Sequence, residues 1–79
     1  MDKLSTIGSN LRAARKRSFP RDDLNAFALR IGVSRATLQR MEKGDLSVSL
    51  GKYYRAAEVL GLTAPFATLL KPEQSLFND

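Results

Sequence analysis

The sequence predicts an all-α fold of five short helices. Apolar residues recur at steps of three and four, capping residues and glycines bound each such stretch, and no segment alternates apolar and polar residues as a strand would. A chain of 79 residues has room for one small domain with a modest core. We expect this domain to span residues 1–70, and residues 71–79 to form a flexible C-terminal tail.

Two helices are expected before residue 32. The first runs from about Thr6 to Lys16, and Pro20 forbids its simple continuation. The second is Leu24–Ile31, capped by an aspartate at 22–23 and closed by Gly32. Their apolar stripes are Leu4, Ile7, Leu11 and Ala14 in the first helix, and Leu24, Phe27, Ala28 and Ile31 in the second.

A third helix over residues 34–43 follows after only two intervening residues. Ser34 is a suitable N-cap, and Gly44 suits a left-handed stop. Two short helices joined by a tight turn with a glycine predict a helix-turn-helix over residues 23–43, with its second helix presented outward.

Two further helices complete the prediction. Ser49 can cap Leu50–Leu60, which Gly61 ends, and Thr63 can cap a short fifth helix. The stripe of the fourth helix is Leu50, Tyr53, Tyr54, Ala57 and Leu60, and Phe66, Leu69 and Leu70 are expected to be buried in the fifth segment.

The helix over residues 34–43 has two unlike faces. Leu38 and Met41 lie on one side, and the other side carries three cations and an amide without a carboxylate. A solvated face usually mixes glutamate with lysine, whereas arginine and glutamine have the multi-donor ends that bind bases and phosphates. Both interpretations stay open on this segment alone; the polar residues are Arg35, Gln39, Arg40 and Lys43.

Charge and composition narrow the functional classes. The net charge is +5, and residues 1–43 hold ten of the 13 basic residues but four of the eight acidic ones, which favours a polyanionic partner. Cysteine and histidine are absent, so we expect no disulfide, no Cys/His metal site, no cofactor and no enzyme. Without a signal-peptide pattern or a long apolar run, we expect a cytoplasmic protein that does not enter membranes.

The segments FALRIGVSRATLQRMEKGD and VSLGKYYRAAEVLGL resemble the Cro/C1-type (Xre) helix-turn-helix family of transcriptional regulators, whose fold is lambda-repressor-like. The resemblance covers roughly Ile7 to Leu70. Residues 48–70 more particularly resemble small Xre regulators encoded beside toxin genes, including antitoxins of Hip-type operons.

The resemblance implies a set of contacts with double-stranded DNA. Base contacts are expected from Arg35, Ala36, Gln39 and Arg40, and phosphate contacts from Ser34, Thr37, Lys43, Arg17 and Arg21. It also implies an ion pair between Arg15 and Glu42, for which the physical reason is that an unpaired acid at the edge of a buried face is costly.

Two positions depart from the family pattern. Many relatives begin the second helix with Thr-Gln, whose glutamine clamps a phosphate, and Asp23 and Leu24 stand there in this chain. The contact is then missing, or Arg17 or Arg21 supplies it. Ala36 replaces a polar base reader and offers at most contact with a thymine methyl group.

These observations predict a homodimeric repressor that binds a palindromic operator near its own gene. The alternative is an antitoxin that masks a toxin partner and binds DNA for autoregulation. The candidate residues for the dimer or partner interface are Tyr53, Val59, Leu62, Leu69, Leu76 and Phe77.

Overall fold

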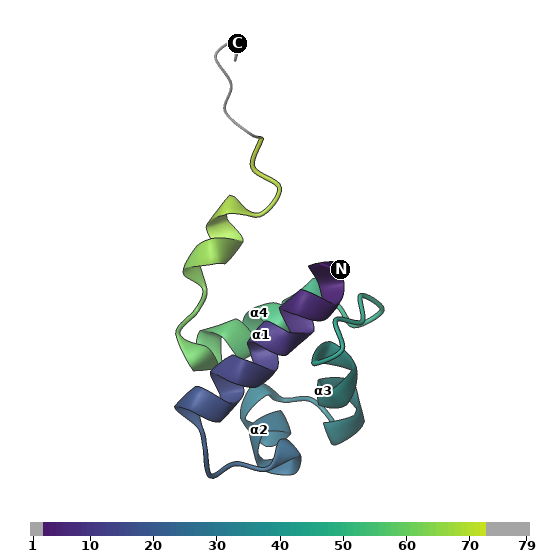
Figure 1. The fold of residues 1–79 in the computed structure, drawn as a ribbon, viewed down its shortest axis with the longest axis vertical. Coiled ribbons are helices and arrows are strands. Elements are labelled where there is room, and N and C mark those ends of the chain that lie inside the picture. Colours follow the sequence, from purple (N-terminus) through teal and green to yellow (C-terminus); the bar gives the residue numbers. More distant parts are fainter. Residues whose placement is uncertain (1–2, 73–79) are drawn as a thin grey trace.

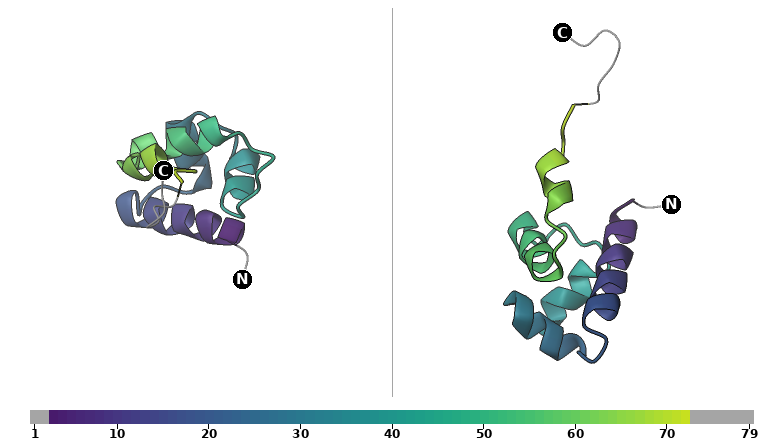
Figure 2. Two further views of the ribbon diagram at one scale, coloured as in Figure 1. Left: turned by 90° about the horizontal axis from the view of Figure 1, so that it is seen from above. Right: turned by 90° about the vertical axis from the view of Figure 1, so that its left-hand side faces the viewer.

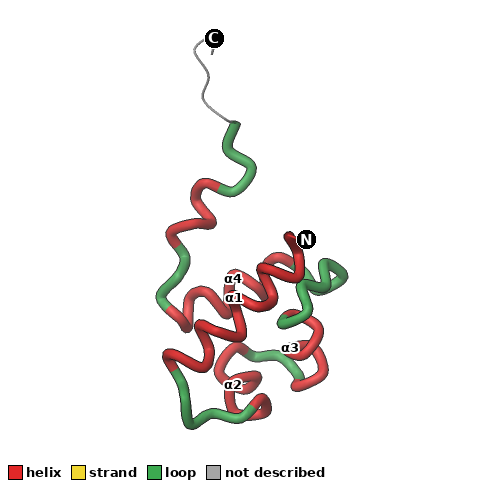
Figure 3. Tube along the Cα trace, in the orientation of Figure 1, coloured by secondary structure: helices red, strands yellow, loops and turns green. Residues whose placement is uncertain are grey.

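The computed structural model describes residues 3–72, which contain four α-helices and one 3-10 helix and no strand (Figures 1 and 3). The all-α prediction is confirmed. The elements are α1 (Lys3–Ser18), α2 (Leu24–Ile31), α3 (Arg35–Met41), α4 (Leu50–Leu60) and the 3-10 helix η1 (Ala64–Thr68).

The helix-turn-helix is built from local signals that the sequence carries. The Asp23 carboxylate accepts a hydrogen bond of 2.8 Å from the amide of Ala26, and the Ser34 hydroxyl accepts one of 3.0 Å from the amide of Thr37. Gly32 ends α2 in the left-handed conformation, at a φ of 72°. Because residues with a side chain rarely adopt this backbone conformation, the turn favours glycine at this position. The predicted caps of α2 and α3 are confirmed.

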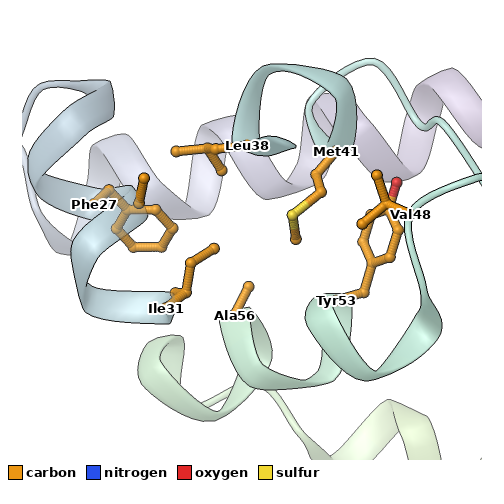
Figure 4. Close-up of a cluster of buried hydrophobic side chains, with 8 residues drawn as sticks. Phe27, Ile31, Leu38, Met41, Val48, Tyr53 and Ala56 are labelled. Atoms are coloured by element: carbon orange, nitrogen blue, oxygen red, sulfur yellow. The ribbon is translucent and has the colours of Figure 1, made fainter. Parts of the chain in front are cut away.

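The core lies where α2, α3 and α4 meet, and Figure 4 shows side chains from these helices converging there. Phe27, Leu38 and Met41 are its largest fully buried side chains. Val48, from the segment between α3 and α4, closes one side of it. The outward face of α3 is therefore set by the burial of Leu38 and Met41 on its other side.

α1 approaches the end of α3 backbone to backbone. A Cβ atom added at Gly8 would lie 2.6 Å from the amide nitrogen of Gly44 and closer still to the carbonyl oxygen of Glu42. Gly44, at a φ of 77°, meets the carbonyl of Leu4 in the same way. Gly8 thus has a packing role that the sequence analysis did not identify.

Some expectations about helix boundaries and capping bonds were wrong. α1 extends beyond the predicted Thr6–Lys16 at both ends. Ser49 stands at the N-cap of α4 but makes no side-chain capping bond, and the fifth helix is a 3-10 helix without such a bond from Thr63.

Several expectations about burial were also wrong. In α1 and α4 the packing surface is shifted, because Gly8, Arg15 and Ala56 take the central positions that larger apolar residues were expected to fill. η1 extends away from α2 and α3 in Figure 1, and the two leucines that follow it lie outside the core. The predicted core residues that are exposed are Leu4, Ile7, Leu50, Tyr54, Leu69 and Leu70.

We predict that Gly8→Ala lowers the free energy of unfolding by about 1–3 kcal/mol, because the added methyl group forces α1 away from residues 42–44. Gly51→Ala is the matched control, since Gly51 lies in α4 with only the Ser49 hydroxyl, at 3.9 Å, near its position. It should stabilise the protein by about 0.5–1 kcal/mol through helix propensity. Urea unfolding of both variants measures the difference, and equal effects would contradict the close approach.

Candidate nucleic-acid interface

The outward face of α3 is polar and exposed. Arg35, Gln39, Arg40 and Lys43 are all exposed, together with Ala36, whereas Thr37 is half-buried. α3 itself contains no acidic residue. Glu42, which follows the helix, is turned inward and paired with Arg15. Such a surface attracts a polyanion.

Arg40 is held by the segment that follows α3. Its Nε donates to the Asp45 carboxylate at 3.1 Å, and its Nη2 donates to the Ser47 hydroxyl. Hydrogen bonding from Ser47 and the nearby Arg40 guanidinium together lower the pKa of Asp45 from 3.8 to about 2. The sequence analysis missed both partners, although an aspartate two residues before a serine is a turn signal that indicates such a structure.

A shallow hollow separates the first turn of α2 from Arg35 at the start of α3. Asp23, Leu24, Asn25 and Arg35 line it. Leu24, which stands where relatives carry a phosphate-binding glutamine, packs against the core. Asn25 is exposed at the edge of the hollow and was not considered in the sequence analysis.

The predicted phosphate contacts Arg17 and Arg21 are exposed, but they lie before α2 rather than beside α3. Figure 1 places the connection between α1 and α2 on the other side of α2 from α3. Arg30 of α2 holds the connection between α1 and α2 in place. It donates hydrogen bonds to the Asp22 carboxylate, and its guanidinium lies 4.1 Å from the centre of the Phe19 ring. The ion pair lowers the pKa of Asp22 and raises the pKa of Arg30.

Arg15 and Glu42 form the expected ion pair between α1 and the end of α3. The Arg15 Nε and Nη2 atoms donate to the two Glu42 oxygens at 2.6 and 3.1 Å. Both side chains are at most 10% exposed. A buried, bidentate pair of this kind fixes geometry, because either partner alone would be a buried charge without a counterion.

An apolar groove of about 320 Å³ lies between α1, α4 and η1. Figure 2 shows η1 extending from the end of α4 away from α2 and α3. The partly exposed side chains that line the groove are Ile7, Leu46, Leu50, Leu62, Phe66 and Leu69.

Of the residues predicted for a dimer or partner interface, only some line this groove. Leu62 and Leu69 line it and are about half exposed. Tyr53 lies at its base and is 8% exposed, so it belongs to the core, and Val59 packs against the core. Leu76 and Phe77 lie outside the described residues.

Residues 3–72 contain neither a metal-binding cluster nor a membrane-spanning helix. No cluster of three or more acidic side chains there could hold a metal ion. None of the helices of this part is long and apolar enough to cross a membrane.

A helix-turn-helix whose second helix presents an exposed basic face has the architecture of a DNA-binding domain. The family model HTH_3, described as helix-turn-helix, matches residues 21–66. The chain therefore belongs to the Cro/C1-type helix-turn-helix family and is a DNA-binding transcription regulator. Among curated proteins and solved structures, none matches the chain.

We predict that Arg15→Ala lowers the free energy of unfolding by about 3–5 kcal/mol, because Glu42 is left as a buried charge. Arg55→Ala is the matched control, since Arg55 pairs with Glu58 at 3.5 Å on the surface of α4. Its cost should stay below about 1 kcal/mol. Thermal or urea unfolding distinguishes the two, and a small cost at Arg15 would contradict a structural role for the pair.

Proposed function

We propose that the protein is a sequence-specific repressor that binds a palindromic operator as a homodimer. The observation that carries this proposal is the exposed basic face of α3, a helix without an acidic residue, whose orientation is fixed by the buried Leu38 and Met41. In this proposal α3 enters the major groove and the dimer occludes the promoter of its own gene.

The proposed contacts divide into base reading and backbone binding. Arg35, Gln39 and Arg40 read base edges, and Ala36 contributes at most an apolar contact. The residues proposed to contact phosphates are Ser34, Thr37, Lys43, Asn25, Arg17 and Arg21.

A homodimer is proposed because one such domain covers a single half-site and makes few base contacts. The apolar groove supports this part of the proposal. It presents partly exposed leucines on elements other than the helix-turn-helix, so its burial against a second copy leaves α3 accessible. A toxin partner remains the second candidate, because the same groove would suit an apolar surface of another protein.

We expect wild-type protein to enrich a preferred duplex from a random DNA library. Arg40→Ala should weaken binding to this duplex by about 1–3 kcal/mol while affecting a scrambled duplex much less. Arg55→Ala removes the same charge from α4 and serves as control. Fluorescence anisotropy over a salt series measures all three proteins, and failure to enrich any sequence would contradict the proposed specificity.

We expect the protein to sediment as a dimer at micromolar concentration and Leu62→Glu to sediment as a monomer, because the new charge lies in the groove. Leu29→Glu is the control, since Leu29 is 81% exposed on α2 and does not line the groove. A monomeric wild type would contradict the homodimer, and a dimeric Leu62→Glu variant would place the interface elsewhere.

A further inference from the structure

The Arg40 guanidinium is held along one edge only. An arginine presents two pairs of parallel N–H bonds: a side edge formed by Nε and Nη2, and an end edge formed by Nη1 and Nη2. Asp45 accepts from Nε, and Ser47 accepts from Nη2 at 2.5 Å. Among the described residues, these contacts use the two nitrogens of the side edge, and none of them involves Nη1.

We propose that Asp45 and Ser47 are positioning residues that hold the side edge of the Arg40 guanidinium and leave its end edge for bidentate pairing with a guanine. Guanine offers two neighbouring acceptors, N7 and O6, in the major groove. This inference rests on the proposed function, in which Arg40 reads bases, and it names the base that Arg40 reads.

The two holding groups are themselves fixed. The Tyr53 hydroxyl donates to the Asp45 carbonyl at 2.8 Å, and the Asp45 amide donates to the Arg40 carbonyl at 3.1 Å. The second Asp45 carboxylate oxygen accepts from the Ser47 amide at 2.8 Å. Because Tyr53 belongs to the core, the backbone of Asp45 is tied to the core and not only to a surface loop.

The ion pair leaves much of the arginine exposed. Because the pKa of Asp45 lies near 2, its carboxylate is charged at neutral pH. The Arg40 side chain nevertheless keeps 48% of its surface exposed. A long side chain loses rotamer freedom on binding, and a side chain that is already held loses less.

Competition is the opposing interpretation of the same contacts. In that case Asp45 withholds Arg40 from DNA, and its removal strengthens binding. The geometry favours positioning, since Nη1 makes no contact among the described residues and Nη2 carries a second hydrogen beside the one bound by Ser47.

The test uses the duplex enriched by wild-type protein and a scrambled duplex of equal composition. Each guanine of the enriched duplex is replaced in turn by 7-deazaguanine, which lacks the N7 acceptor. The position whose replacement weakens binding of wild type but not of Arg40→Ala identifies the guanine read by Arg40.

We expect Asp45→Asn to reduce the preference for the enriched duplex about threefold to tenfold, together with the sensitivity to 7-deazaguanine at that position. Ser47→Ala should reduce both in the same direction, and Ser47→Thr should retain both because it keeps the hydroxyl. Glu58→Gln removes one negative charge from α4 and controls for net charge. In an Arg40→Ala background, Asp45→Asn should change the preference no further.

Two kinds of failure are distinguishable. If the wild type prefers the enriched duplex and needs Arg40, but Asp45→Asn leaves the preference unchanged or raises it, the positioning role is overturned and the proposed function stands. If the wild type shows no preference, or Arg40→Ala retains it, the proposed function itself falls. Circular dichroism of each variant shows that it is folded.

Discussion

The position of the segment that ends α3 depends on the contact between α1 and residues 42–44. Gly8 permits the backbone of α1 to meet this segment, and Arg15, two turns further along α1, binds Glu42 with both of its side-edge nitrogens. Steric fit and charge pairing therefore act at one place, on one face of α1. A buried ion pair adds little net stability over apolar packing, but its geometric requirements leave the end of α3 one position.

Once α3 is fixed, the molecule presents two different surfaces on different elements. The face of α3 is basic and lies on the helix-turn-helix, whereas the groove between α1, α4 and η1 is apolar. The basic face attracts a polyanion, and the apolar groove does not. The groove instead favours binding of a protein, because binding removes its apolar surface from water. The separation allows a DNA-bound protein to bind a second chain at the same time.

The segment between α3 and α4 connects the core to the basic face of α3. Val48 of this segment fills one side of the core, and the backbone carbonyl of Asp45 accepts a hydrogen bond from Tyr53. Asp45 and Ser47 also accept hydrogen bonds from Arg40. A base-reading side chain is most selective when its own surroundings hold it still. This segment therefore connects the packing of the core to the chemistry of the basic face.

The sequence by itself determined the helix order, the helix-turn-helix with its Asp23, Ser34 and Gly32 signals, and the outward residues of α3, because capping and helical periodicity act between near neighbours. Only the tertiary structure decided the rest. The stripe of α1 became a groove wall because Gly8 and Arg15 made the contact with α3, and Arg40 acquired Asp45 and Ser47 as partners. Such outcomes depend on which surfaces meet in space, and residue spacing along one helix carries no information about the neighbouring element.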